Sequence, residues 1–346
     1  MKVPPLGSGA RSERGAIIVW MALFLLLLLA FGSLGVDVAK LAATRTQLQN
    51  AADAAALAGA SALDPNTGLI QTDVAVPRAQ VAALSNKAFV SDPQPIVLDA
   101  ADVTFPGPGM VRVTTRRQGD QSVVTTLAQV LGITRLEMTA TATAKVDTTG
   151  TALCGIVPLG CTPPAGQTFQ IGCSNIYTLK VGGGAGTNGQ YGAVDFPNCG
   201  DQGDCAGMPA TGANTFRCLL EHGYCCGVSI GDVLNTESGS MSGPTQQAIN
   251  YLFDNDVVKT QDICYDDYLA AGGNGERVVF VPLTTPVAGN ATVTVQGFAA
   301  FFLRARVGSG VNQTLTGEFL YKTIPGTGGG SGSGAVTYSL RLVPNP

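Results

Sequence analysis

An uncharged apolar run near the start of the sequence is long enough to cross a lipid bilayer. Residues 16–36, AIIVWMALFLLLLLAFGSLGV, contain no charged side chain. As a helix these 21 residues rise about 31 Å, which matches the hydrocarbon core of a membrane. Lys2, Arg11 and Arg14 precede the run. We therefore expect residues 1–15 to form a cytoplasmic tail and the body to lie outside the cytoplasm.

The helical pattern continues beyond this run through residues 37–63. Small and apolar residues recur at spacings of four and three, which predicts a narrow seam that packs closely on a neighbour. Asp37, Lys40, Thr44 and Gln47 are expected on the opposite side, and the sequence DPNTG ends the helix. The seam is expected to pack on the protein's own residues 65–147, with a helix of another subunit as the alternative. It consists of Leu34, Val38, Leu41, Arg45, Leu48, Ala52, Ala55, Gly59 and Ala62.

This stretch resembles the N-terminal domain of TadG-like proteins of the Flp pilus, or tight adherence, system. The family pattern has Arg-Gly, an apolar span, Val-Asp and an alanine-rich motif. The resemblance implies a single-pass bacterial inner-membrane protein, with other Flp pilus assembly proteins as partners in pilus assembly or surface attachment. The matching residues are Arg14, Gly15, Asp37, Leu48, Gln49, Asn50, Ala51, Ala52, Asp53, Ala54, Ala55, Ala56, Leu57 and Ala58.

Two kinds of N-terminal processing are alternatives to an uncleaved anchor. A signal peptide could be cut near Ser33 and Gly35, but its apolar core usually spans only about 7–15 residues. Type IV prepilins are cut after a glycine that has a glutamate at the fifth following position. The fifth residue after Gly15 is Trp20, so the sequence does not predict this cleavage.

Residues 64–147 are expected to form a small α/β unit. The sequence predicts a helix after Pro77 and a second helix over residues 122–132. Strands are predicted at 100–105 and 110–117. Residues 135–146 alternate strictly between apolar and polar side chains, which is typical of a half-buried strand.

Residues 148–346 are expected to form a Cys/Gly-rich, β-rich extracytoplasmic domain, which makes the fold class of the chain α+β. Strands are predicted within residues 276–284, 291–307, 313–324 and 335–343, with a flexible glycine-rich loop at 326–334. One face of the second strand is expected to carry Val293, Val295, Phe301, Leu303, Ala305 and Val307.

All nine cysteines lie between Cys154 and Cys264. Their spacings fit no zinc motif, and His222 is the single histidine. The cluster predicts up to four disulfides in an oxidising compartment, with Cys199–Cys205 as a candidate local pair. The candidates for disulfide bonding are Cys154, Cys161, Cys173, Cys199, Cys205, Cys218, Cys225, Cys226 and Cys264.

Four other features were weighed as chemical sites. SGSM at 238–241 resembles the metal-dependent adhesion site of von Willebrand A domains, but Thr236 stands where that site needs an aspartate. GGGAGTNG at 182–189 lacks the lysine and hydroxyl of a phosphate loop. His222 could form a nucleophilic dyad with a cysteine, although a structural role is expected. Weak calcium binding is the alternative to a solvated surface for Asp254, Asp256, Asp262, Asp266 and Asp267.

The charge pattern excludes nucleic acid as a partner, because the net charge is −4 and no basic cluster exceeds Arg116–Arg117. No catalytic site, metal, cofactor or small-molecule substrate is predicted. The sequence therefore predicts a non-enzymatic, membrane-anchored component of Flp pilus assembly or surface attachment. A membrane-anchored extracytoplasmic enzyme or a metal-dependent adhesin is the alternative.

Overall fold

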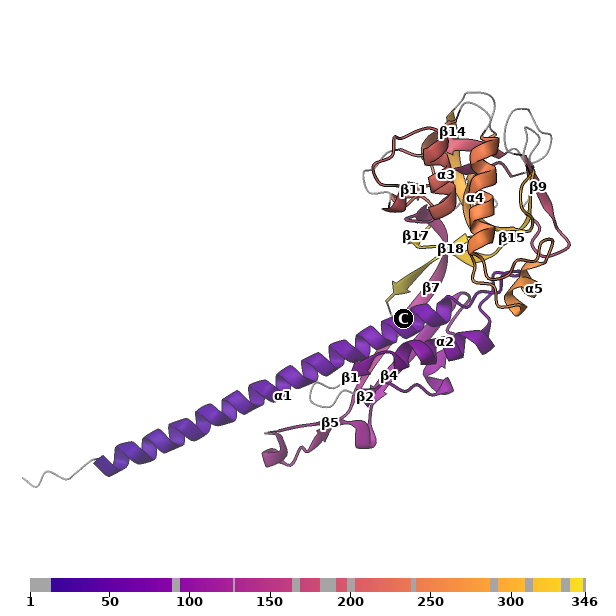
Figure 1. Ribbon diagram of the computed structural model, residues 1–346. Helices are drawn as coiled ribbons and strands as arrows, with labels where there is room; N and C mark the ends of the chain where they lie inside the picture. The colour runs from indigo at the N-terminus through magenta and orange to yellow at the C-terminus, as the bar shows by residue number, and fades with distance from the viewer. Residues whose placement is uncertain are drawn as a thin grey trace, which may run out of the picture.

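One long helix leads into a body of two lobes in the computed structural model (Figure 1). The helix is α1 (Arg14–Ala60), whose N-terminal half stands clear of the body. The N-lobe contains the rest of α1, α2 and the sheet around β4 and β7, and the C-lobe contains the second large sheet with α3, α4 and α5. The structure describes residues 14–88, 94–126, 128–163, 169–180, 191–197, 203–237, 241–286, 292–308, 314–330 and 337–344.

The N-terminal half of α1 has the surface of a membrane-spanning helix. Its large apolar side chains from Ile17 to Phe31 are all exposed, and an 18-residue window there has a mean hydropathy of 2.7 with none of it buried. Among the described residues, this is the one helix long and apolar enough to cross a membrane. An exposed apolar surface of this size is unfavourable in water. It indicates that this half of α1 lies in an apolar environment.

The N-lobe is a helical layer on an antiparallel sheet. Helices α1 and α2 (Thr72–Leu84) pack together on β4 and β7. The sheet order is β16–β18–β7–β4–β3, and only β16 and β18 are parallel. Its strands are β3 (Val103–Thr104), β4 (Met110–Arg117), β7 (Met138–Ala152), β16 (Lys322–Thr323) and β18 (Thr337–Val343).

Short elements complete the N-lobe. Strands β11 (Val228–Ser229) and β17 (Gly326–Gly328) pair with the far end of β7. Two small hairpins pair β1 (Lys87–Ala88) with β2 (Gln94–Pro95) and β5 (Val123–Val124) with β6 (Arg135–Leu136). The 3₁₀ turns are η1 (Ala100–Asp102), η2 (Gly119–Gln121) and η3 (Ala128–Leu131).

Two local predictions for this lobe are corrected by the structure. Helix α2 begins at Thr72 and includes Pro77, instead of starting after it. The predicted helix over residues 122–132 is wrong. This segment forms β5 and the turn η3, and it leads into β6, which pairs with β5. β-branched residues precede the turn, and Thr125 N donates to Thr134 O at 3.1 Å, which closes a hairpin instead of a helical turn.

The predicted strand over residues 135–146 is present with different bounds, because residues 135–136 belong to β6 and β7 runs from Met138 to Ala152. Strand β7 continues to Ala152, so the expected boundary at residues 147 and 148 falls inside it. Its second neighbour is β18, which pairs from Tyr338↔Thr148 to Val343↔Thr143. The N-lobe sheet is therefore completed by a strand that begins 185 positions after β7 ends, at Thr337.

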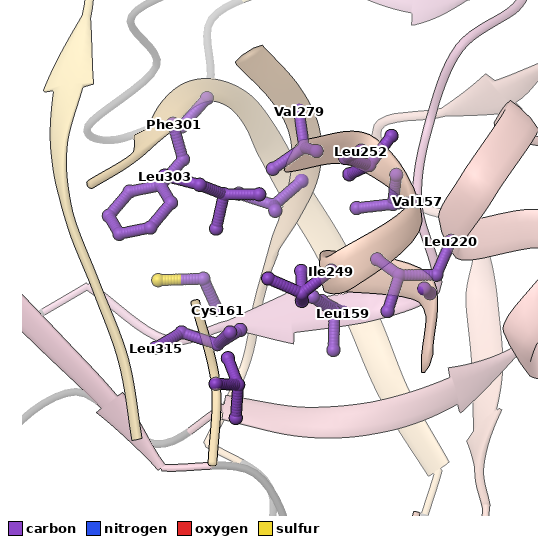
Figure 2. Packing of buried hydrophobic residues seen from close by; sticks show 14 of the residues in the cluster. Val157, Leu159, Cys161, Leu220, Ile249, Leu252, Val279, Phe301, Leu303 and Leu315 are labelled. Atoms are coloured by element: carbon purple, nitrogen blue, oxygen red, sulfur yellow. The ribbon is translucent and has the colours of Figure 1, made fainter. Parts of the chain in front are cut away.

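The C-lobe is a seven-stranded sheet with helices on its faces. The strand order is β12–β10–β8–β13–β14–β15–β9. Helices α3 (Ala213–His222) and α4 (Ser242–Asn255) cover one core, where Leu220, Ile249 and Leu252 point toward sheet residues (Figure 2). The remaining elements are α5 (Tyr265–Ala270), η4 (Gly203–Cys205), β8 (Leu159–Cys161), β9 (Tyr177–Lys180), β10 (Tyr191–Asp195), β12 (Val233–Thr236), β13 (Val278–Thr284), β14 (Thr292–Leu303) and β15 (Thr314–Leu320).

A β-bulge corrects the predicted face of β14. The register with β13 shifts between Leu283, opposite Gly297, and Thr284, opposite Val295. One extra residue reverses which side chains share a face. Val293 and Val295 therefore pack with Phe298, whereas Phe301 and Leu303 belong to the core under α3 and α4.

Candidate functional site: the junction of anchor and body

Asp37 joins the anchor helix to the body at the end of the apolar run. Its carboxylate accepts hydrogen bonds from the backbone N–H groups of Thr126 at 2.6 Å and Ala128 at 3.2 Å. Lys40 Nζ donates to Thr126 Oγ1 at 2.9 Å. Backbone amides that point at a carboxylate stabilise its charge, so Asp37 stays buried, with 4% of its surface exposed. One matched family residue thus holds the β5–β6 hairpin against α1.

The predicted seam is correct in its C-terminal part and wrong in its N-terminal part. Leu48, Ala52, Ala55 and Ala62 are buried on the body side. Nearer the membrane the structure instead buries Asp37 and Thr44, while Leu34, Val38 and Arg45 are exposed and Leu41 is half-buried. Val36 and Val38 lie on opposite sides of the helix there and both are exposed, so the apolar pattern does not identify the side that faces the body.

Small side chains let α1 approach the N-lobe closely. The alanine face of α1, defined as Leu48, Ala51, Ala52, Ala55, Ala56 and Ala60, packs in one cluster with α2, β4 and β7. A Cβ atom on Gly59 would lie 3.0 Å from Val111 Cγ1 and 3.4 Å from Ala75 O. A larger residue there would push the helices apart, so the alanines and Gly59 fix the spacing of the two layers.

The polar residues of the matched motif lie at the edge of this face. Gln49 Nε2 donates to Asp53 Oδ1 at 2.8 Å and approaches Thr141 O of β7 at 3.4 Å. Asn50 is exposed. Thr115 Oγ1, from β4, donates to Leu48 O at 2.9 Å. The motif therefore combines apolar packing with polar links from α1 to both central strands.

The turn after α1 connects the two lobes. Asp64 accepts hydrogen bonds from the backbone N–H groups of Asn66 and Thr67 at 2.7 and 2.9 Å, and Asn66 Nδ2 donates to Asp266 of α5 at 3.1 Å. Tyr321 N donates to Pro65 O at 2.8 Å. Burial alone would raise the pKa of Asp64, but these backbone and side-chain hydrogen bonds outweigh it and lower that pKa.

Disulfides are present where the sequence predicts them, but the predicted local pair is wrong. Cys205 bonds to Cys218 across the start of α3, so it is not the partner of Cys199, which lies outside the described residues. The other described bonds are Cys154–Cys225 and Cys173–Cys264, and Cys226 is also disulfide-bonded. Cys161 keeps a thiol, buried in the core of Figure 2.

His222 lies beside acids and a tyrosine at the end of α3. Its Nδ1 is 3.4 Å from Asp204 Oδ2, and its ring packs edge-on against Tyr251. The neighbouring Cys225 and Cys226 are in disulfides, so they offer no thiolate for a dyad. A cleft of about 280 Å³ borders His222, Glu221 and Glu276, which is small for a ligand pocket.

The predicted acidic group does not form one surface patch. Asp256 is buried, 3.4 Å from Arg277 Nε, and it accepts a hydrogen bond from Tyr268 Oη at 2.6 Å. Burial and this bond raise the pKa of Tyr268. Asp254 pairs with Arg306 at 2.6 Å on the surface. No group of three or more potential metal-ligating side chains occurs in the described part of the chain.

A second cleft contains a carboxyl pair at its edge. It measures about 370 Å³ and is bordered by Asp195, Asp232 and Asn235. Burial, a hydrogen bond with Glu237 and the charge of Glu237 raise the pKa of Asp195 to about 7. Sequence reasoning missed this pair, because β10 and β12 bring it together from segments 40 positions apart. Residues 182–189 and 238–240, weighed above as phosphate and metal sites, lie outside the described residues.

Comparison with known families supports the resemblance carried by α1. Residues 15–62 match the Tad family model of Flp pilus-assembly TadE/G-like proteins. The match covers the anchor helix and the alanine face, and it suggests involvement in Flp pilus assembly. Neither the comparison with curated proteins nor that with solved structures gave a match.

Proposed function

We propose that a chain built on this Tad-type helix is a single-pass inner-membrane component of Flp pilus assembly or surface attachment. Residues 1–15 would remain in the cytoplasm, residues 16–36 would span the membrane, and the two lobes would lie outside the cytoplasm. The proposal rests on the observation that α1 is one unbroken helix, which continues from its exposed apolar half into the core of the N-lobe. A helix used in this way holds the body at a fixed place relative to the membrane.

The proposed orientation rests on charge and redox chemistry. Lys2, Arg11 and Arg14 precede the span, and positively charged flanks favour the cytoplasmic side. The described disulfides all lie in the body, and disulfides persist in oxidising compartments. Both features support a body outside the cytoplasm.

We propose a non-enzymatic role because two of the chemical candidates in the sequence are engaged structurally. Asp256 is paired with Arg277, and the cysteines beside His222 are in disulfides. In the region that matches the family model, the alanine-rich motif forms a packing face. The protein would act by presenting its lobes to other assembly proteins.

A reporter fusion tests the topology. A periplasm-active enzyme fused after Pro346 should be active, and the same enzyme fused before Lys2 should be inactive. The protein should remain with membranes after alkaline washing. A soluble product that starts near Val36 would instead establish a cleaved signal peptide.

Deletion of the gene tests the pilus role. Loss of surface pili or attachment is expected, and the wild-type chain should restore it. Ala55→Glu, which disrupts the alanine face, should fail to restore it, whereas the exposed control Asn50→Glu should succeed. Normal pili and attachment in the deletion strain would contradict the proposed role.

A further inference from the structure

The contacts of Asp37 place part of the body at the membrane surface. Asp37 is the first charged residue after the exposed apolar run of α1. The backbone nitrogens of Thr126 and Ala128 lie 2.6 and 3.2 Å from its carboxylate oxygens. The hydrocarbon core ends near this residue, and the headgroup layer extends several ångströms beyond it. Residues 126 and 128 are therefore at the depth of the lipid headgroups when α1 spans a bilayer.

These residues belong to the membrane-proximal hairpin, which we define as the described residues 122–126 and 128–136. It contains β5, η3 and β6, and it is the part of the body that lies beside the middle of α1 (Figure 1). Two large apolar side chains project from it: Val124 is 40% exposed and Ile133 is 45% exposed. Val123, which precedes Val124 in β5, is buried.

The described turn satisfies much of its own backbone hydrogen bonding. Ile133 N donates to Ala128 O at 2.9 Å, Gly132 N donates to Gln129 O at 2.9 Å, and Thr125 Oγ1 donates to Ile133 O. A segment can enter the edge of a bilayer at low cost only when its backbone polar groups have partners. This turn meets that condition while it keeps apolar side chains outside.

We infer that the membrane-proximal hairpin is a second membrane contact, with Val124 and Ile133 inserted at the boundary of headgroups and acyl chains. The occupant of this surface is lipid, because the hairpin adjoins the apolar surface of α1, where Leu34, Val36 and Val38 are also exposed. Two contacts, one from α1 and one from the hairpin, prevent the body from swinging about the helix. The inference rests on the proposed anchoring of α1.

Tryptophan fluorescence in vesicles tests this contact, because Trp20 is the one tryptophan of the chain. Full-length Trp20→Phe,Ile133→Trp and Trp20→Phe,Val124→Trp proteins are reconstituted in phosphatidylcholine–phosphatidylglycerol vesicles. Lipids brominated near the top of the acyl chains should quench both new tryptophans, and aqueous iodide should quench them weakly. The matched control is Trp20→Phe,Val257→Trp, because Val257 is 63% exposed and lies in the C-lobe. Iodide should quench it and brominated lipid should not.

The wild-type protein separates failure of the anchor from failure of the inference. Quenching of Trp20 by lipids brominated near the top of the acyl chains reports insertion of α1, because Trp20 is close to the start of the apolar span. If lipid quenches Trp20, but the tryptophans at 124 and 133 are quenched by iodide and not by lipid, the hairpin does not contact the membrane and α1 still spans it. If Trp20 is not quenched, both are wrong. Adding Asp37→Ala to the Ile133→Trp protein should reduce quenching by lipid, since the hairpin loses its acceptor on α1; unchanged quenching would overturn the role of Asp37.

Discussion

The N-lobe and the C-lobe form their cores from different side chains. In the N-lobe cluster the described buried residues are aliphatic, and alanines predominate. The C-lobe buries Phe253, Phe298, Phe301, Phe302 and Phe319, a charged pair and the described disulfides. Small side chains fix a short distance between helix and sheet, whereas bulky ones fill a wider space between strands and peripheral helices. From this difference we expect the N-lobe to transmit the position of α1 and the C-lobe to be stabilised mainly by its own contacts.

The buried ion pair of the C-lobe gives the largest expected effect. Arg277→Met would leave Asp256 charged and buried without its partner, which should cost about 3–5 kcal/mol of unfolding free energy. The guanidinium also lies 4.6 Å from the Tyr268 ring centre and 4.8 Å from that of Phe253. Hydrogen exchange measured by mass spectrometry should rise in C-lobe peptides and stay constant in α1 and β4.

The control for this variant is a similar pair on the surface. Arg306→Met removes the exposed contact with Asp254 and should cost about 1 kcal/mol or less. If Arg277→Met and Arg306→Met lower the unfolding free energy equally, burial does not determine how much Arg277 contributes to stability. Faster exchange in the N-lobe would show that the two cores are not independent.

Loss of the longest described disulfide should have an effect of similar size. Cys173–Cys264 closes 91 positions and Cys205–Cys218 closes 13, so loop-closure entropy predicts about 4.6 and 3 kcal/mol respectively. One variant for each disulfide replaces both of its cysteines with serine. Urea unfolding of the two variants, followed by hydrogen exchange of C-lobe peptides, measures the two losses of unfolding free energy. The order of the two costs is the test. The N-lobe should keep its protection from hydrogen exchange in reducing agent. If N-lobe peptides exchange faster after reduction, the stability of the N-lobe depends on the C-lobe disulfides.

A charge in the alanine face should destabilise the N-lobe alone. Ala55 is fully buried, so Ala55→Glu should cost about 2–4 kcal/mol through overpacking and an unpartnered carboxylate. Asn50→Glu puts the same side chain on the exposed side of α1 and should be neutral. Limited proteolysis should release fragments of residues 64–152 only from Ala55→Glu. Intact folding of both variants would show that this face is not a core.

The smallest expected effect is a difference in pH response. Asp195 has a folded-state pKa of about 7, well above its unfolded value, so the folded C-lobe holds an extra proton between about pH 4 and 7. C-lobe stability should therefore fall as the pH rises through this range, by about 1 kcal/mol after solvent screening. Glu237→Gln should flatten this profile, and identical profiles for the two proteins would contradict the role of the carboxyl pair.

The N-lobe should respond to pH with the opposite sign. Burial alone would raise the pKa of Asp147, but hydrogen bonds from Lys145 and Arg341 and their charges lower it overall. The resulting stability is present above the unfolded pKa and is lost as the pH falls below about 4. Arg341→Met should weaken that acid sensitivity, as measured by N-lobe exchange.

The sequence predicted the parts of the fold that depend on local pattern. The course of α1, the strand now seen as β7 and the α+β class follow from periodicity and from the Tad resemblance. The alanines belonged to a recognisable motif and Gly59 to the predicted seam, so their packing face was found before its partner was known. The C-lobe offered no comparable motif, and α3, α4 and α5 were not predicted.

The errors at Asp37, at β14 and in the pairing of Cys205 share a different cause, since each depends on contacts between distant segments. Asp37 is buried because residues 126 and 128 return to it. The faces of β14 are set by a bulge, and the partner of Cys205 is set by the place of α3. Neither spacing nor propensity contains that information. The Asp195–Glu237 pair was missed for the same reason.

Strand β18 is synthesised long after its partner β7, which has a consequence for folding during synthesis. At about 5–20 residues per second, tens of seconds separate the emergence of β7 from that of its partner strand. In the proposed topology α1 would already be in the bilayer during this interval while one edge of β7 remains open, and an open edge can pair with other chains. In that topology the nascent protein would expose an unpaired strand edge beside the membrane, and a chaperone outside the cytoplasm that covers strand edges would raise its yield.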